Sequence, residues 1–241
     1  MIVNERLVTY LDSLTWQIPE PMQELEQWAL QKEVPIIRRS MQSLLLFMLR
    51  LRQPKHVLEI GTAVGFSALL MRSELLPDAT LDTIEKVPAR IRDAKENFAK
   101  YPQGDKIRLL EGDAADILAA LVREQKQYDF IFMDAAKGQY AAFLNPIYDL
   151  LQPGGLLVTD NVLQEGDIIE SRYAIRRRDR TIHGRMRGFL YEMTHSEQWD
   201  SVILPVGDGA LLSYKKTNVK QMSEYGKIML VNCIIVRYNE I

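Results

Sequence analysis

Hydrophobic positions along the chain first recur with a helical period and then alternate between strand-like and helical runs. Amphipathic helices are expected over residues 4–15, 21–33 and 38–52. Beyond them, short apolar runs typical of strands cover His56–Ile60, Thr80–Glu85, Ile107–Leu110, 128–133 and 156–159. Between these runs, helical patterns follow the turn Gly61–Gly65 to about Leu76 and then cover 88–101, 114–125 and 138–151, the last leading into the turn Pro153–Gly155. This alternation predicts a parallel, doubly wound α/β sheet with helices on both faces.

The last two strand-like runs are connected differently. Ser201–Pro205 and Ala210–Tyr214 are separated only by Val206–Gly209. So short a connection permits only an antiparallel hairpin, because a parallel neighbour needs a crossover of a dozen or more residues. The sequence therefore predicts a Rossmann-like sheet of seven strands, five parallel and two in an antiparallel C-terminal hairpin, with extra N-terminal helices. One domain is expected over residues 1–216, including N-terminal helices within 1–53, and 217–241 forms a C-terminal extension of unknown role.

Composition is that of an ordinary soluble protein. The 241 residues are 47% hydrophobic and 26% charged, with a net charge of −2, so no overall polyelectrolyte partner is implied. The single cysteine, Cys233, cannot form an internal disulfide. The apolar run Leu44–Leu49 is far too short to cross a bilayer, and the first residues lack a signal-peptide pattern. We expect a cytoplasmic protein that does not associate with membranes.

Oxygen-donor side chains stand where two neighbouring strand-like runs stop. Asp134 ends the run 128–133, and the pair Asp160 and Asn161 ends the run 156–159. Carboxylate and amide oxygens side by side at a sheet edge suit a small divalent cation such as Mg²⁺. Lys137 follows Asp134 by three residues and adds a candidate base beside the candidate metal site.

A second group of residues suggests a nucleoside pocket along the same edge. The turn with Gly61 and Gly65 matches neither a dinucleotide fingerprint nor a Walker A loop, and alone it is a weak signal. Glu85 ends the second strand, where an acid can accept hydrogen bonds from both ribose hydroxyls. Gly112, Asp113 and Ala114 follow the third strand, and Asp113 is also suited to cap the next helix. A nucleoside pocket without a phosphate-binding loop fits S-adenosylmethionine, which has a ribose and an adenine but no phosphate.

Several segments together resemble the cation-dependent class I O-methyltransferases, which include catechol and caffeoyl-CoA O-methyltransferases. The resemblance covers roughly residues 30–215. Its carriers are Val57-Leu-Glu-Ile-Gly-Thr-Ala-Val-Gly-Phe-Ser67, Glu85, Glu111-Gly-Asp-Ala114, Met133-Asp-Ala-Ala-Lys-Gly-Gln-Tyr140 and Thr159-Asp-Asn161. Within the family, the chain looks most like the bacterial tRNA 5-hydroxyuridine methyltransferases, on Asp134–Tyr140, Thr159–Leu163 and Pro205–Gly209.

The resemblance implies a role for each matching residue. Mg²⁺ would be bound by Asp134, Asp160 and Asn161, and Lys137 would be the catalytic base near the acceptor oxygen. Alternatively, Lys137 stays charged and stabilises the oxyanion. The methyl donor would be held by Gly61, Ser67, Glu85, Gly112, Asp113, Ala114 and Asp134. Catechol and 5-hydroxyuridine both offer two neighbouring oxygens, so the metal site alone does not identify the acceptor.

A basic segment follows the second group of oxygen donors. Residues 172–187 contain seven arginines: Arg172, Arg176, Arg177, Arg178, Arg180, Arg185 and Arg187. A charge run of this kind is usually a solvated helix face, but arginine also suits phosphate recognition, and this run lies directly after the metal site. Arg38 and Arg39 extend the possible patch, whereas His183 and His195 lack ligand-like spacing and are expected to be structural or surface residues.

Three functions remain open. The favoured one is methylation of 5-hydroxyuridine at the tRNA wobble position to 5-methoxyuridine, with the tRNA anticodon region as partner. The main alternative is a small-molecule O-methyltransferase acting on a catechol-like phenol, which keeps every metal and cofactor residue. The least favoured is a non-catalytic nucleoside- or RNA-binding module, against which the intact set of Asp134, Lys137, Asp160 and Asn161 argues. The family resemblance also implies a homodimer, with the N-terminal helices contributing to it.

Overall fold

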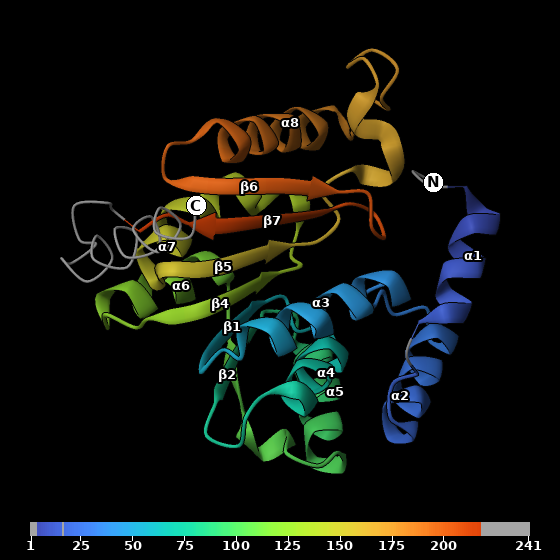
Figure 1. The fold of residues 1–241 in the computed structure, drawn as a ribbon, viewed down its shortest axis with the longest axis vertical. Coiled ribbons are helices and arrows are strands. Elements are labelled where there is room, and N and C mark those ends of the chain that lie inside the picture. Colours follow the sequence, from blue (N-terminus) through green and yellow to red (C-terminus); the bar gives the residue numbers. More distant parts are fainter. Residues whose placement is uncertain (1–3, 16, 218–241) are drawn as a thin grey trace, which may run out of the picture.

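The computed structural model describes residues 4–15 and 17–217, and they build one seven-stranded sheet (Figure 1). The strand order is β3-β2-β1-β4-β5-β7-β6, with β1 to β5 parallel and β7 antiparallel to both of its neighbours. The strands are β1 His56–Ile60, β2 Thr80–Glu85, β3 Ile107–Glu111, β4 Tyr128–Met133, β5 Leu151–Thr159, β6 Trp199–Leu204 and β7 Ala210–Lys215. The predicted fold class is confirmed, including the antiparallel C-terminal hairpin.

Helices cover both faces of the sheet. The central strands are buried on both sides because their residues alternate between two cores. In β4, Phe130 and Phe132 face the first core, whereas Ile131 and Met133 face the second. The first core is shared with α2 Glu20–Gln31, α3 Arg39–Arg52, α4 Phe66–Glu74 and α5 Pro88–Lys100. The second is shared with α6 Ala114–Arg123, α7 Tyr140–Leu150 and α8 Arg180–His195.

The N-terminal helix is the least integrated element. Helix α1, Glu5–Leu14, begins at Asn4, whose side chain accepts a hydrogen bond from the backbone N–H of Arg6. None of its residues is buried, and in Figure 1 it lies at the margin of the fold with α2. Its large apolar side chains are therefore exposed: Leu7, Tyr10, Leu11 and Leu14.

Two elements differ from the sequence-based expectation. Strand β5 begins at Leu151 rather than at residue 156, because Leu151 already pairs with Tyr128 of β4. The register shifts after this pair, and the expected turn Pro153–Gly155 lies inside the resulting irregular strand. The sequence indicated only a solvated helix face within 172–187, whereas helix α8 covers Arg180–His195, because the arginines of its first half obscure an apolar face. Met186, Phe189 and Met193, at helical spacing, are buried on that face.

Part of the C-terminal extension lies outside the described residues. The expectations for Cys233 and for the apolar run 228–236 fall there, and the division into a domain ending at 216 and an extension stays a prediction. Over the described part of the chain, none of the helices combines the length and the apolar character that crossing a membrane requires.

Candidate active site

The carboxyl ends of three adjacent strands bring the predicted oxygen donors together. The backbone N–H of Asp134 donates to Ile60 of β1 at 3.0 Å, and that of Asp160 donates to Met133 of β4 at 3.0 Å. The amide nitrogen of Asn161 donates to Oδ1 of Asp134 at 2.9 Å. Asn161 takes a left-handed backbone conformation (φ 61°), which asparagine adopts more readily than most residues. The fold therefore places Asp134, Asp160 and Asn161 in one cluster.

Electrostatics in this cluster favour a bound cation. Burial raises the pKa of Asp134, although the hydrogen bond from Asn161 and the nearby charges of Lys137 and Arg90 oppose this effect. The pKa of Asp160 rises to about 7, first because of burial and then because of the negative charge of Asp134. The buried carboxylate of Asp160 and the partly buried carboxylate of Asp134 repel each other, and a divalent cation between them would relieve this repulsion.

The donor chemistry fits a hard cation with an open coordination shell. Since the amide nitrogen of Asn161 donates to Asp134, its amide oxygen is the atom available as a ligand. Within residues 4–15 and 17–217, no group of three or more His, Cys, Asp or Glu side chains is arranged to hold a metal. The available ligands are the carboxylates of Asp134 and Asp160 and the amide oxygen of Asn161, which would bind a cation such as Mg²⁺ and leave positions for water or an acceptor oxygen.

Lys137 lies beside the cluster at the start of a short 3₁₀ turn, η2 Lys137–Gln139. Its ammonium nitrogen donates to Oδ2 of Asp208 at 3.1 Å. Tyr140, directly after this turn, donates its hydroxyl to the backbone oxygen of Asp160 at 3.1 Å. Sequence reasoning missed both Asp208 and Tyr140 as parts of the site.

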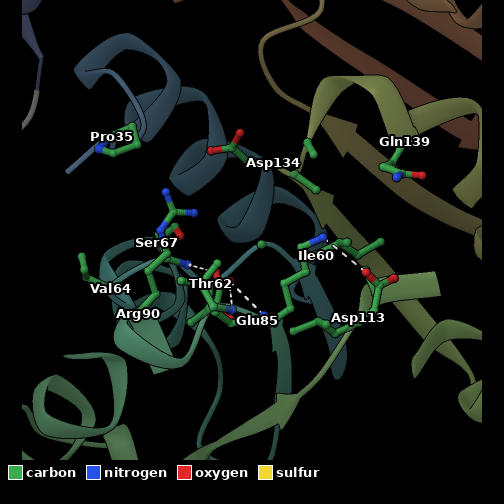
Figure 2. A pocket seen from close by; sticks show the side chains of 18 of the residues that line it. Pro35, Ile60, Thr62, Val64, Ser67, Glu85, Arg90, Asp113, Asp134 and Gln139 are labelled. Atoms are coloured by element: carbon green, nitrogen blue, oxygen red, sulfur yellow. Dashed lines mark hydrogen bonds and ion pairs between the residues drawn. The ribbon is translucent and has the colours of Figure 1, made fainter. Parts of the chain in front are cut away.

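A cavity of about 410 Å³ opens along the same sheet edge. It is lined by all the residues predicted to hold the methyl donor and by Lys137: Gly61, Ser67, Glu85, Gly112, Asp113, Ala114, Asp134 and Lys137. Figure 2 shows Ser67, Glu85, Asp113 and Asp134 around this space. The structure thus brings the predicted residues to one cavity, although their individual roles remain proposals.

Gly61 in the first strand-to-helix turn and Glu85 at the end of β2 shape the cavity. Gly61 has φ +107°, and a Cβ there would overlap the backbone oxygen of Asp134, so the turn and the metal cluster are packed together. Glu85 is buried and accepts backbone N–H groups from Ala63, Lys86 and Val87, each at 2.9 Å. Of about four acceptor positions on a carboxylate, these bonds leave about one for a ligand hydroxyl.

Glu59 contacts Ser67 of the cavity lining and was not predicted as a site residue. Its side chain is fully buried and accepts hydrogen bonds from the hydroxyls of Ser67 and Thr83, both at 2.5 Å. Burial raises the pKa of Glu59 to about 7, and the two hydroxyl hydrogen bonds oppose this effect. An acid between Leu58 and Ile60, inside an otherwise apolar strand, was the signal that could have revealed it.

Arg90, near the start of α5, is a second residue that sequence reasoning missed. It lines the cavity, and in Figure 2 it lies on the same side as Ser67 and Pro35, away from Asp113. Its positive charge also acts on Asp134. One side of the cavity therefore offers a guanidinium, which is suited to bind a carboxylate.

The arginines of the basic segment divide into two groups, and none of them lines the cavity. Three on α8 contact backbone oxygens: Arg180 with Ile175 at 3.0 Å, Arg185 with Gly138 at 3.0 Å, and Arg187 with Ile168 at 3.5 Å. The other four, all exposed, lie between η3 Gln164–Ile169 and α8: Arg172, Arg176, Arg177 and Arg178. Three arginines of the segment are therefore hydrogen-bonded to the backbone, whereas the side chains of the other four are exposed to solvent.

The remaining side chains singled out in the sequence have structural contacts. Arg38 pairs with Glu165 at 2.8 Å, and Arg39 pairs with the buried Glu26 at 3.1 Å. His183 is buried in α8, whereas the exposed His195 stacks on Tyr191. Both histidines lie on α8, as one buried and one surface residue.

Comparisons with known proteins identify the family. A family model described as O-methyltransferase matches residues 13–216. A caffeoyl-CoA O-methyltransferase of Nicotiana tabacum is 30% identical over 203 residues, which cover 80% of this chain and 83% of that protein. A catechol O-methyltransferase of Niastella koreensis is 34% identical over 122 residues, covering 50% of this chain and spanning only 55% of that relative.

Solved structures agree with this assignment. The Podospora anserina methyltransferase PaMTH1, bound to S-adenosylhomocysteine, superimposes with a TM-score of 0.78 at 29% identity, covering 89% of this chain and 97% of its own. These relatives are named for catechol or caffeoyl-CoA acceptors or as methyltransferases, so a resemblance to tRNA 5-hydroxyuridine methyltransferases stays a prediction. The chain belongs to the O-methyltransferase family, and the enzyme class predicted from its sequence, an S-adenosylmethionine-dependent O-methyltransferase, is confirmed.

Proposed function

We propose that this enzyme transfers a methyl group from S-adenosylmethionine to a hydroxyl of a small catechol-like acceptor, with the help of Mg²⁺. The observation that carries this proposal is one continuous site, in which Asp134 belongs both to the donor cavity and to the cluster with Asp160 and Asn161. A methyl donor and a cation-bound acceptor would therefore meet at Asp134, beside Lys137.

The methyl donor would occupy the cavity of about 410 Å³. Glu85 would accept a hydrogen bond from a ribose hydroxyl, and Arg90 would bind the amino-acid carboxylate. Two similar structures support the choice of ligand: PaMTH1 holds S-adenosylhomocysteine, and the O-methyltransferase TomG of Streptomyces achromogenes holds S-adenosylmethionine. TomG is 26% identical, with a TM-score of 0.73 over 87% of this chain and 95% of its own.

The reaction is an in-line displacement at the methyl carbon. The acceptor oxygen forms the new C–O bond as the C–S bond breaks, and sulfur keeps that electron pair, giving S-adenosylhomocysteine. A cation held by Asp134, Asp160 and Asn161 would lower the pKa of the acceptor hydroxyl and orient it. Lys137 would either accept the hydroxyl proton or stabilise the oxyanion by its charge, with the proton then passing to water.

The comparisons favour a small acceptor over tRNA, because the similar proteins are named for catechol or caffeoyl-CoA. A second candidate is 5-hydroxyuridine at the tRNA wobble position. It is favoured by the four exposed arginines between η3 and α8, which follow the metal cluster in the chain. Such side chains could bind RNA phosphates while one base enters the site.

Parallel assays separate the two acceptors. Methyl transfer is measured with 3,4-dihydroxybenzoate and with tRNA that carries unmethylated 5-hydroxyuridine, each with Mg²⁺ or with EDTA and at several salt concentrations. For the small acceptor, we expect transfer that needs the cation and varies little with salt. Transfer to tRNA alone, falling steeply with salt, would favour the second candidate. Binding of S-adenosylmethionine with no transfer to either acceptor would contradict the proposed function.

We further propose that the enzyme is a homodimer to which α1 contributes. The helix presents Leu7, Leu11 and Leu14 at helical spacing, all exposed, and none of its residues is buried within the chain. Covering these side chains with a second copy would remove a considerable apolar area from water. Sedimentation of the wild type and of Leu11→Glu tests this: the dimer should weaken in the variant, and a wild-type monomer would contradict the proposal.

A further inference from the structure

The turn of the C-terminal hairpin contributes a buried carboxylate beside the candidate metal site. Asp208 lies between β6 and β7, yet it is only 4% exposed. Its Oδ2 accepts the hydrogen bond from Nζ of Lys137 at 3.1 Å, and its Oδ1 accepts from the backbone N–H of Glu165. A buried carboxylate in a hairpin turn is unusual, because turn residues normally face solvent.

Backbone contacts fix this turn against the loop that follows the metal donors. The N–H of Val162 donates to the backbone oxygen of Gly209, and that of Leu163 donates to the backbone oxygen of Asp208, both at 3.0 Å. Gly209 has φ +88°, and a Cβ at this position would overlap the side chain of Leu163. The carboxylate of Asp208 is therefore held in place by both its backbone and its side chain.

The contact with Asp208 restricts a flexible side chain. Lysine has four rotatable side-chain bonds and three N–H donors, so without a fixed partner its ammonium group samples many positions. The side chain of Lys137 is 34% exposed, whereas that of Asp208 is 4% exposed, so the buried carboxylate is the anchor. One N–H of Lys137 points to Asp208, which leaves two donors for an acceptor oxygen.

Both carboxylate oxygens of Asp208 already accept hydrogen bonds, Oδ2 from Lys137 and Oδ1 from Glu165, so we assign Asp208 to Lys137 rather than to the metal donors. It also does not line the cavity of the methyl donor. We propose that Asp208 is a positioning residue for methyl transfer, which holds the ammonium of Lys137 beside the metal cluster. This role rests on the proposed function, in which Lys137 acts on the acceptor hydroxyl.

The variant Asp208→Asn tests this role with little structural change. The asparagine oxygen still accepts from the N–H of Glu165, whereas its amide nitrogen does not accept from Lys137. We expect kcat for the small acceptor to fall by about 10- to 100-fold, as misplaced catalytic groups typically cause. The dissociation constant of S-adenosylhomocysteine should stay unchanged. Asp208→Glu, which keeps the charge, should recover part of kcat.

Asp200→Asn is the matched control, because Asp200 is an exposed carboxylate of the same hairpin that pairs with Lys216 at 3.1 Å. It should leave kcat unchanged. A double-mutant cycle with Lys137→Met supplies the decisive result. If Asp208 acts through Lys137, Asp208→Asn should have no further effect in the Lys137→Met background.

Three outcomes would overturn the positioning role: wild-type kcat in Asp208→Asn, equal effects of Asp208→Asn with and without Lys137→Met, or weakened methyl-donor binding that accounts for the whole loss of activity. An inactive wild-type enzyme would instead contradict the proposed function. The two failures are therefore distinguishable.

Discussion

Replacing Glu59 by glutamine should make the enzyme more stable at neutral and alkaline pH. In the folded protein, the pKa of Glu59 is raised to about 7 by burial, compared with an ordinary value of 4.5. The unfolded chain therefore releases this proton at a lower pH than the folded chain does. Between these two pH values the folded state holds more protons, so the free energy of unfolding decreases as pH rises.

The size of the effect follows from the same two values. The pKa of Glu59 in the folded protein lies about 2.5 above its ordinary value. At about 1.36 kcal/mol for a pKa difference of one, this corresponds to about 3 kcal/mol. Glutamine does not titrate, and its amide oxygen can accept from one of the hydroxyls of Ser67 and Thr83 while the other hydroxyl rotates to accept from its amide nitrogen. Relative to wild type, Glu59→Gln should therefore gain about 3 kcal/mol in the free energy of unfolding between pH 4.5 and pH 8.

Urea denaturation of both proteins at several pH values measures this difference. Subtracting the wild-type curve from that of the variant removes the contributions of other groups, including Asp160. Glu96→Gln, which changes an exposed acid on α5, is the control and should give a difference near zero at every pH. A difference between Glu59→Gln and wild type that does not vary with pH would refute the reasoning.

Three further predictions concern the site. Gly61→Ala should destabilise the fold by about 1–3 kcal/mol and weaken S-adenosylhomocysteine binding, because its φ is +107° and its Cβ would overlap Asp134; denaturation and calorimetry measure both effects. The affinity for Mg²⁺, measured by titration calorimetry, should fall below pH 7, because the pKa of Asp160 is about 7 and protons compete with the cation. Asp160→Ala should abolish Mg²⁺-dependent activity in a methyl-transfer assay. Arg90→Met should weaken S-adenosylhomocysteine about tenfold but not 5′-methylthioadenosine, which lacks the carboxylate, so equal losses for both ligands would contradict the role of Arg90.

Much of the candidate site could be predicted from the sequence, because parallel strands of a doubly wound sheet present their carboxyl ends at one edge. Residues at or directly after the ends of such strands, such as Glu85, Asp134 and Asp160, therefore gather at that edge whatever the details of packing. Their position was predictable from local periodicity alone. Residues outside strand ends, such as Arg90 and Asp208, carry no comparable signal.

The sequence by itself determined the alternation of strands and helices, the antiparallel hairpin and the edge at which the oxygen donors meet, because hydrophobic period and connection length are local properties. Only the tertiary structure decided that β7, rather than β6, pairs with β5. Because β7 lies between β5 and β6, the hairpin turn reaches the loop that follows Asn161. Asp208 of this turn thereby contacts Lys137, 71 residues earlier in the chain. Such a contact depends on how distant segments pack, which no local pattern encodes, and it joins the C-terminal hairpin to the candidate active site.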